Sequence, residues 1–346
     1  GVFTGDASVV SVGKVQVGDQ VLVTDSIVIA TGAEQKSLGP IAIDGQQIWG
    51  AREAMTPTAL PARLLIVGAG AIGVEFASFY RALGSAVTLL EVAPNILPAE
   101  DIDISALAAE ALSQRGINVQ VGQGLEGLAS VAGCVEATIA GETLEFDAAI
   151  LSVGVAGRVQ GLGLEALGVT MNQGFVVVDE RQQTSVPGIY AIGDVAGAPC
   201  LAHKATHEAM IAAETIAGHF VQGLQRDRIP GCTYSFPQIA SIGLREQDAG
   251  DRALRIGRFP LYANGKAVVS GHTEGMIKTI FDSKTGALLG AHLIGDSVTE
   301  LIQGFTVAIG LETTEHELLE TIFPHPTVSE AMQESVMLAF DRPLHL

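Results

Sequence analysis

Residues 64–91 read LLIVGAGAIGVEFASFYRALGSAVTLLE. The short apolar run Leu64–Val67 predicts a buried strand. Gly68-x-Gly70-x-x-Gly73 follows it at once. Each glycine has a physical role: the first permits a sharp turn, the second lets a pyrophosphate approach the backbone, and the third lets a helix pack closely on the strand.

The second half of this stretch predicts a helix and a further strand. Apolar residues at helical spacing indicate an amphipathic helix that ends at Gly84. These residues are Ile72, Phe76, Phe79 and Leu83. Ala86–Leu90 predicts a second strand, which ends on Glu91. The glycine pattern alone is weak evidence, but the order strand, glycine turn, helix, strand and acid is that of a βαβ dinucleotide-binding unit.

Glu91 indicates which dinucleotide binds. It lies 18 residues after Gly73, where a carboxylate accepts hydrogen bonds from a ribose 2′-OH and repels a 2′-phosphate. No arginine follows it directly, so NAD is favoured over NADP. The predicted helix start presents free N–H groups to the phosphates. The candidate NAD-binding residues are Gly68, Ala69, Gly70, Ala71, Ile72, Gly73, Val74, Glu75 and Glu91.

Composition narrows the class of protein. The 346 residues are more than one ordinary domain needs, and 48% hydrophobic against 16% charged residues provides ample material for cores. The 41 glycines and few aromatic residues suit an α/β protein with many turns. A net charge of −19 speaks against nucleic acid as a partner. No apolar run is long enough to span a bilayer, so no membrane partner is predicted.

The number and spacing of the cysteines indicate the redox environment of the protein. Cys134, Cys200 and Cys232 are far apart and form neither a C-x-x-C pair nor a zinc-ligand spacing. No secretory signal stands at the N-terminus. We therefore expect a reducing cytoplasm and no metal site.

The N-terminal residues have the pattern of strands in the middle of a domain rather than at its start. Three alternating runs separated by glycines predict an antiparallel meander, and Ile27–Ala30 predicts a buried strand that runs into Thr31-Gly32. Because the chain starts at Gly1 in such a pattern, we expect that the N-terminal part of a longer protein is missing.

Two later strand ends are candidate ligand sites, because ligands gather at the carboxyl ends of strands in open α/β sheets. The apolar run Ala148–Val153 ends at Gly154, where the nicotinamide end of NAD could lie against bare backbone. An ordinary strand-terminal glycine is the alternative. Ile189–Ile192 is followed by Gly193-Asp194, which places a carboxylate where it could bind sugar or ribityl hydroxyls.

The C-terminal third has a different pattern. From Cys232 the runs are typical of antiparallel strands, with a hairpin whose loop is Asp282–Gly286. Helices follow at about 298–309 and 315–321. We expect an α/β fold of dinucleotide-binding, Rossmann-like domains with a C-terminal α+β domain. The predicted parts are 1–57 and 179–230 (two pieces of one FAD-binding and central domain), 58–178 (NAD-binding) and 231–346 (dimerisation).

His325 lies between two prolines shortly before a predicted helix. Histidine suits general acid/base catalysis because its pKa lies near working pH, and Glu330 could set its tautomer and basicity. The alternative is structural: Thr327 as N-cap with Glu330 forms an ordinary capping box. Spacing alone leaves both interpretations open.

Together these motifs resemble the flavin-dependent pyridine nucleotide–disulfide oxidoreductases, and among them the dihydrolipoamide dehydrogenases. The resemblance covers essentially the whole chain, with the motifs in that family's order. They are Ile29-Ala30-Thr31-Gly32, the Gly68–Glu75 turn with Glu91, Ser152-Val153-Gly154, Tyr190–Asp194, Leu201-Ala202-His203-Lys204-Ala205 and His325-Pro326-Thr327-x-Ser329-Glu330.

The resemblance implies a homodimeric flavoprotein that uses FAD and NAD. Asp194 would bind the flavin ribityl chain, with Thr31 and Gly32 near the FAD and Leu125 near the NAD adenine. Cys200, Leu201, Ala202 and His203 would lie alongside the isoalloxazine. His325, paired with Glu330, would take a proton from a dihydrolipoyl thiol across the dimer interface, and electrons would pass through a redox disulfide and FAD to NAD. The partner would be a lipoyl-bearing carrier protein or a small dithiol.

Two features of the family are absent from these residues. The first GxGxxG, which binds the ADP half of FAD, is not present, and neither is a C-x4-C redox disulfide. Thr206-His207 also stands where the family usually has acidic residues. Glutathione reductase is disfavoured by Glu91, and mercuric reductase by the lack of a C-terminal cysteine pair. The alternatives to a dihydrolipoamide dehydrogenase are an NAD-binding dimeric module without redox activity and a related disulfide reductase with another substrate.

Overall fold

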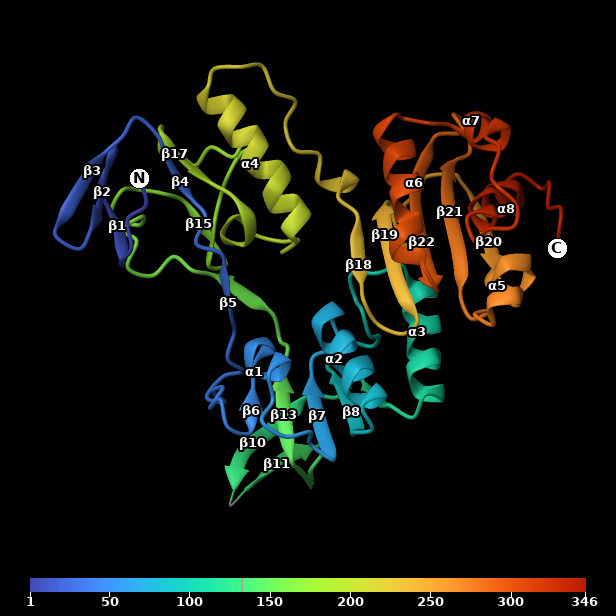
Figure 1. Ribbon diagram of the computed structural model, residues 1–346, viewed down its shortest axis with the longest axis horizontal. Coiled ribbons are helices and arrows are strands. Elements are labelled where there is room, and N and C mark those ends of the chain that lie inside the picture. The colour runs from blue at the N-terminus through green and yellow to red at the C-terminus, as the bar shows by residue number, and fades with distance from the viewer. Residues whose placement is uncertain (132) are drawn as a thin grey trace. The chain divides into compact units, whose positions relative to one another are not determined.

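The computed structural model describes residues 1–131 and 133–346 (Figure 1). The chain forms two compact units, each built from two segments. One comprises Gly1–Lys36 and Gly154–Arg226, and the other comprises Ser37–Val153 and Asp227–Leu346. The division into four functional parts stays a prediction.

A five-stranded parallel sheet carries the glycine turn. Its strand order is β6-β13-β7-β8-β9. The strands are β6 (Ile48–Trp49), β7 (Arg63–Val67), β8 (Ala86–Glu91), β9 (Asn118–Val121) and β13 (Ala148–Leu151). Because side chains alternate along a strand, Leu64 and Ile66 pack on one face while Leu65 and Val67 pack on the other. The predicted βαβ unit is confirmed, with α2 (Ala71–Ala82) between β7 and β8.

The packing face of α2 differs from the predicted one. The residues buried on the sheet are Gly73, Val74, Ala77 and Tyr80. Of the four residues expected to form the apolar face, Phe76 packs against the core, whereas Ile72, Phe79 and Leu83 are exposed. Small residues at the contact let the helix approach β7 and β8 closely, as the third glycine of the motif requires.

Two further groups of elements cover the parallel sheet. Helices α1 (Ala51–Met55) and α3 (Ile102–Gln114) add to the core on the α2 side. On the other face lies an antiparallel sheet of β10 (Leu125–Val131), β11 (Cys134–Ile139) and β12 (Glu142–Phe146). Most of β12 is exposed, and only Phe146 of this strand is buried.

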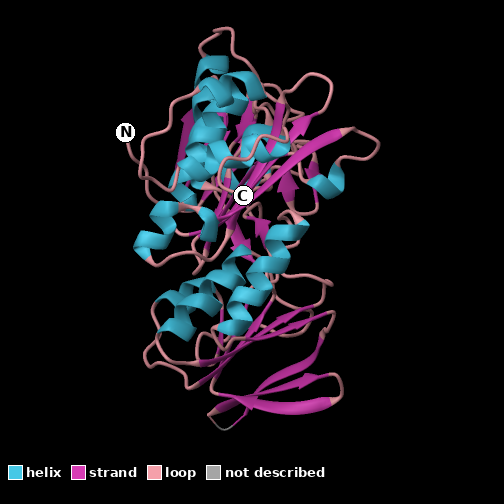
Figure 2. Cartoon of the chain, turned by 90° about the vertical axis from the view of Figure 1, so that its right-hand side faces the viewer, coloured by secondary structure: helices cyan, strands magenta, loops and turns pink. Residues whose placement is uncertain are grey.

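Residues 231–346 form the predicted antiparallel part. The sheet order is β18-β19-β22-β21-β20. Its strands are β18 (Gly231–Thr233), β19 (Gln238–Gly243), β20 (Leu254–Pro260), β21 (Met276–Asp282) and β22 (Leu288–Gly295). Helix α6 (Val298–Gly310) packs on β19 and β22, while α8 (Glu330–Ala339) packs on β20 and β21. Figure 2 shows the chain coloured by secondary structure, with helices in cyan and strands in magenta. The short helices α5 (Gly265–Ser270) and α7 (Glu315–Glu320) complete this part, and α7 starts with a capping box of Thr314 and Glu317.

A row of polar side chains crosses this antiparallel sheet. Ser241, His292, Lys278 and Arg258 are cross-strand partners on neighbouring strands. The Lys278 ammonium is fully buried and lies 2.7 Å from Asp101 and 2.6 Å from Asp103, at the start of α3. Glu246 contacts it as a third carboxylate at 2.5 Å. A buried ion cluster thus joins the antiparallel part to the α3 end of the parallel-sheet part.

The other unit contains the N-terminal meander of β1 (Ala7–Ser11), β2 (Lys14–Val17) and β3 (Gln20–Val23), as predicted. The parallel pair β4 (Ile27–Ile29) and β17 (Ile189–Ala191) lies in its core. The antiparallel pair β5 (Ala33–Gln35) and β14 (Val155–Gly157) follows, with the small hairpin of β15 (Met171–Asn172) and β16 (Phe175–Val176). Helix α4 (Ala202–Ile216) follows the short 3-10 turn η1 (Gly193–Ala196). In the described part of the chain, no helix has the length and apolar character needed to cross a membrane.

Candidate functional site

In the glycine turn after β7, two of the three glycines are tightly packed and the third borders open space. Gly68 has φ +99°, and a Cβ on it would lie 2.5 Å from the Ser152 carbonyl oxygen. A Cβ on Gly73 would overlap the Gly68 carbonyl oxygen. Around Gly70, by contrast, a Cβ would meet no atom within 4 Å. The first and third glycines are therefore required by the fold, and the second leaves open space that a pyrophosphate could occupy.

Helix α2 starts beside this open space. Its N-cap residue is Gly70, which has no side chain to accept from the first N–H groups of the helix. Free N–H groups and the positive end of a 12-residue helix dipole are suited to bind phosphate. The backbone thus fits a dinucleotide at Gly70.

Glu91 is held at the end of β8 by two backbone groups. Its carboxylate is buried and accepts hydrogen bonds from the N–H of Ala69 at 2.7 Å and of Ala93 at 2.8 Å. Each oxygen accepts one of these bonds, and a carboxylate oxygen can accept another. The carboxylate is thus fixed beside the glycine turn, in a position that could receive ribose hydroxyls.

Three other residues predicted to bind NAD are Glu75, Leu125 and Gly154. Glu75, on the first turns of α2, accepts a hydrogen bond from the Tyr234 N–H at 2.8 Å. Leu125 begins β10 and is partly buried. Gly154 has φ +101°, and a Cβ on it would meet nothing within 4 Å. Gly154 therefore offers open backbone at the strand end, as expected, while its contact with NAD stays a prediction.

Asp194 lies in η1, and the peptide before it is clamped by a buried ion pair. Lys204 and Glu208 are fully buried and lie 2.8 Å apart, one turn from each other on α4. Glu208 accepts from the Gly193 N–H at 2.6 Å, and Lys204 donates to the Gly193 carbonyl oxygen at 3.3 Å. The Asp194 carboxylate itself has no hydrogen bond to any described residue, so it could accept from a ligand hydroxyl.

The sequence analysis gave Lys204 only as part of a motif and did not single out Glu208. Their spacing of four residues was the available signal, because such pairs face each other on a helix. What the spacing could not show is that both side chains point into the protein rather than to solvent.

The remaining predicted flavin residues lie in the same unit as Asp194. The Thr31 hydroxyl donates to the Arg158 carbonyl oxygen at 2.6 Å, and Gly32 has φ +75° with open space where a Cβ would be. Cys200 and His203 are exposed near the start of α4, whose N-cap, Leu201, has no capping side chain. A carboxylate without a protein hydrogen bond can accept from the hydroxyls of a ligand, and an uncapped helix start favours a ligand group that carries negative charge.

His325 and Glu330 are in direct contact. The His325 Nδ1 lies 2.9 Å from Glu330 Oε1. Helix α8 begins at Glu330 with Ser329 as N-cap, so the predicted N-cap at Thr327 is wrong. Thr327 instead bonds back to the Pro324 carbonyl through its hydroxyl, and its N–H donates to Glu330 Oε2 at 2.9 Å. The loop thus turns once more before the helix starts.

This geometry fixes the histidine ring for proton transfer. If Nδ1 carries the proton that Glu330 accepts, Nε2 is the basic nitrogen. The side chain of His325 is 81% exposed, so Nε2 is accessible. Partial burial opposes ionisation of Glu330, but the Thr327 N–H and His325 hold the pKa of its carboxyl below the usual range. Glu330 is therefore ionised at neutral pH and supports a protonated imidazole.

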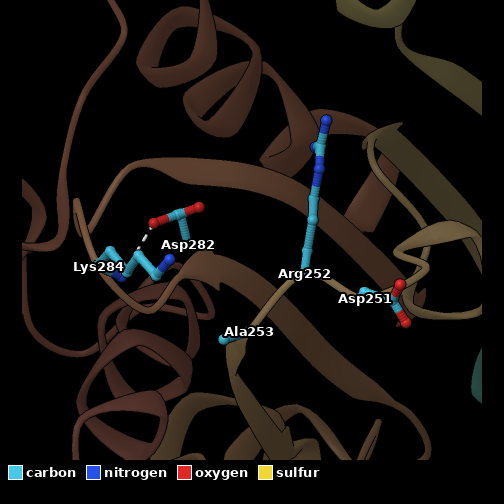
Figure 3. A pocket seen from close by; sticks show the side chains of 5 residues that line it. All are labelled: Asp251, Arg252, Ala253, Asp282 and Lys284. Carbon is cyan, nitrogen blue, oxygen red and sulfur yellow. Dashed lines mark hydrogen bonds between the residues drawn. The ribbon is translucent and has the colours of Figure 1, made fainter.

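A separate hollow of about 420 Å³ lies by the β21–β22 hairpin, lined by Asp251, Arg252, Ala253, Asp282 and Lys284 (Figure 3). Asp282 is already used by the turn, since it accepts from the N–H groups of Lys284 and Thr285. None of the predicted site residues lines this hollow. It is a feature of the hairpin rather than the functional site.

Replacing Gly70 with valine should strongly weaken NADH binding while leaving the fold intact. A Cβ at position 70 would meet no protein atom within 4 Å, so the substitution projects into the space that the pyrophosphate would use. We expect affinity to fall on the order of 100-fold, equivalent to about 2.7 kcal/mol. Calorimetric titration with NADH measures this. Phe79→Ala on the exposed side of α2 is the matched control and should bind normally; equal affinities for the two variants would remove Gly70 from the site.

Comparison with known proteins agrees with this geometry. The family model described as pyridine nucleotide-disulphide oxidoreductase matches residues 1–209. The model of that family's dimerisation domain matches residues 229–336, which supports a homodimer.

Curated relatives extend along most of the chain. A dihydrolipoyl dehydrogenase of Zymomonas mobilis is 50% identical over 335 residues, which cover 94% of this chain and 72% of that protein. One from Rhizobium etli is 50% identical over 337 residues, covering 95% and 70%.

Solved structures show the same fold. LpdA from Mycobacterium tuberculosis matches with a TM-score of 0.88 at 29% identity, covering 96% of this chain and 75% of that one. The flavoprotein disulfide reductase RclA from Escherichia coli matches with a TM-score of 0.89 at 28% identity, covering 96% and 78%. By sequence and by structure, therefore, this chain belongs to the pyridine nucleotide–disulphide oxidoreductases, among their dihydrolipoyl dehydrogenases.

Proposed function

We propose that this chain serves an NAD-dependent dihydrolipoyl dehydrogenase, which passes electrons from a dihydrolipoyl dithiol through a redox disulfide and FAD to NAD. The observation that carries the proposal is the contact between His325 and Glu330 in a chain that is half identical to dihydrolipoyl dehydrogenases. The similarity to RclA is lower, so a disulfide reductase with another substrate is the less favoured reading.

The cofactors are assigned to the two dinucleotide-type sites. We assign NAD to the turn from Gly68 to Glu75, with Glu91 at the adenosine ribose and Leu125 and Gly154 near its two ends. We assign FAD to Asp194, with Thr31-Gly32 and residues 200–203 beside it. When bound, these groups supply the two-electron transfer that amino-acid side chains lack.

The acid/base step follows from the His325 geometry. His325 Nε2 accepts the proton of a dihydrolipoyl thiol, and the S–H electron pair stays on sulfur as a thiolate. The thiolate is the form that attacks a disulfide, with one S–S bond broken as a new one forms. Glu330 stabilises the imidazolium that results, as the acceptor of its Nδ1–H.

The disulfide does not come from the cysteines of this chain. Cys134, Cys200 and Cys232 are free thiols. The proposal therefore concerns a polypeptide in which these 346 residues are accompanied by a redox disulfide. Without one, the chain would be an NAD-binding dimeric module.

We further propose that the substrate is carried on a lipoyl-bearing protein or a small dithiol, that the protein acts as a homodimer, and that it works in the cytoplasm. An apolar groove of about 850 Å³ beside α6 and α7 supports the dimer. Leu311 and Ile322 line it and are 75% and 93% exposed, which is unusual for side chains of this size. The free thiols support a reducing compartment.

The test is an assay of NAD reduction by dihydrolipoamide, with the redox disulfide present. NADP should be at least tenfold poorer, because Glu91 repels a 2′-phosphate. An enzyme that oxidises NADH with another disulfide, but leaves dihydrolipoamide unreacted, would reject the substrate assignment. NADH binding without turnover on any dithiol would favour the binding-module reading.

A further inference from the structure

A buried asparagine contacts the loop of the acid/base pair from a distant part of the chain. Asn264 is 4% exposed and is the N-cap of α5. Its Oδ1 accepts from the Ala267 N–H at 2.9 Å, and its Nδ2 donates to the Thr327 carbonyl oxygen at 3.1 Å. These two partners fix the orientation of the amide, because the reverse would place donor against donor and acceptor against acceptor. One side chain thus joins α5 to the loop that carries His325.

The segment that presents Asn264 is anchored in the core. Leu261, in the 3-10 turn η4 (Leu261–Ala263), and Ala267, in α5, are 0% and 1% exposed and belong to the core of the antiparallel part. The Leu261 N–H donates to the Gly275 carbonyl oxygen at 3.0 Å, just before β21. The Asn264 N–H in turn donates to the Leu261 carbonyl oxygen at 3.0 Å. The backbone of Asn264 is therefore held by a rigid part of the protein.

The loop before α8 has fewer such supports. Residues 324–326 are exposed and belong to neither a helix nor a strand. The apolar side chains that flank them, Phe323 and Val328, pack against the core. The N–H and hydroxyl of Thr327 bond to groups of the loop itself and to Glu330, at the start of α8. Those bonds shape the loop but do not fix its polar part to another element.

Asn264 supplies that connection. Among the described residues, its bond to Thr327 is the one hydrogen bond that joins residues 324–329 to an element other than α8. Its Nδ2 holds the Thr327 carbonyl, and the Thr327 N–H holds one oxygen of Glu330 at 2.9 Å. The other Glu330 oxygen lies 2.9 Å from the Nδ1 of His325. A short series of contacts thus leads from the core to the imidazole.

We propose that Asn264 is a positioning residue for the acid/base pair: it fixes the Thr327 peptide and so holds His325 and Glu330 in one place. The inference rests on the proposed function of His325. Proton transfer requires hydrogen-bond distance, and a misplacement of about 1 Å can cost about 100-fold in rate. The alternative is that Asn264 serves only as the cap of α5.

Two substitutions separate these roles. Asn264→Asp keeps the cap, because aspartate caps a helix as well as asparagine does, but an ionised carboxylate has no N–H to donate to Thr327. Asn264→Ser is the neutral counterpart: serine also caps well, and its shorter side chain should not keep both hydrogen bonds. Asn172→Asp, the same change at an exposed position of β15, is the matched control.

The first measurement is stopped-flow reduction of the bound flavin, in protein that carries the redox disulfide. Dihydrolipoamide requires His325 as base, whereas hydride transfer from NADH does not. Both Asn264 variants should slow reduction by dihydrolipoamide on the order of 10-fold, which is less than in His325→Gln because the base is still present. Reduction by NADH should be unchanged, and Asn172→Asp should be normal with both reductants.

The second measurement needs neither cofactor nor disulfide. NMR gives the rate at which the Thr327 N–H exchanges with solvent in the 346-residue chain. Both Asn264 variants should exchange this proton about 5-fold faster, the effect of about one net hydrogen bond, since the neighbouring carbonyl is released. An unchanged exchange rate in both variants would show that Asn264 does not hold the loop and would overturn the inference.

Three kinetic results would also overturn it. One is normal reduction by dihydrolipoamide in both variants, and another is equal slowing with both reductants, which would show a general disturbance. The third is slowing in Asn264→Asp alone, because the new charge would then be its cause. If Asn264→Asp does not fold, Asn264→Ser alone decides both measurements.

Failure of the proposed function gives a different result. In that case His325→Gln would reduce its flavin with dihydrolipoamide at the normal rate. If His325→Gln is slow while both Asn264 variants are normal, the proposed function stands and this inference alone fails.

Discussion

Lys278→Met is expected to lower the free energy of unfolding by about 3–5 kcal/mol, the usual cost of removing one partner from a buried ion pair. The side chains of Lys278 and Asp101 are both fully buried. Methionine fills most of the volume but leaves Asp101 without its cation. Asp103 and Glu246 would also lose the ammonium, although Arg258 still pairs with both.

The pH dependence follows from the same contacts. Burial opposes ionisation of Asp101, yet Lys278 and the Glu246 N–H hold the pKa of its carboxyl below the ordinary value. The pKa of Asp103 is lowered by Lys278 and Arg258 against its own burial. A carboxyl with a lowered folded-state pKa stabilises the protein above its unfolded pKa, near 3.9, and that stabilisation is lost as the pH falls through the folded value. The cost of Lys278→Met should therefore be largest near neutral pH and shrink in acid.

Urea unfolding at fixed protein concentration measures this difference, because dimerisation makes stability depend on concentration. Lys284→Met, on the exposed turn of the same hairpin, is the matched control and should change stability by less than about 0.5 kcal/mol. Equal unfolding curves for the two variants would show that the Lys278 cluster contributes no net stability. NADH binding in the folded Lys278→Met protein should be unchanged, since no member of the cluster belongs to the glycine turn.

His325→Gln is expected to reduce dihydrolipoamide-dependent turnover by about 10²–10⁴-fold, the usual contribution of a general acid or base. Glutamine keeps a hydrogen-bonding group of similar size next to Glu330 but cannot take up a proton. Because His325 is exposed and lies before α8, its replacement should disturb neither the sheet nor the glycine turn. Steady-state kinetics with dihydrolipoamide and NAD, in protein that carries the redox disulfide, measures the loss.

Two controls make this result specific. The flavin absorbance spectrum and the NADH affinity of His325→Gln should match those of the unchanged protein. Glu330→Gln should retain more activity than His325→Gln, because it removes the group that orients the base rather than the base itself. Normal turnover in His325→Gln would remove this histidine from the mechanism, and loss of flavin would point to a structural role instead.

Much of the fold could be predicted because its signals are local. The run from Leu64 to Glu91 contains its own strand, turn, helix and strand, and neighbouring residues alone specify each of them. The hairpin of β21 and β22 was likewise predicted from a short pattern. The β10 and β12 strands were missed because their outward faces are exposed and their inward faces depend on a sheet formed elsewhere in the chain.

The sequence by itself determined the glycine turn with Glu91, the Gly193-Asp194 strand end and the His325–Glu330 motif, since each is a contiguous pattern with a chemical reason for its spacing. Only the tertiary structure decided which face of α2 is buried, which carboxylates surround Lys278, and that Lys204 and Glu208 clamp the Gly193 peptide. It also brought His345 to Glu334. The physical reason is the same in each case: the direction of a side chain depends on what packs against its element, and those partners are residues distant in the sequence.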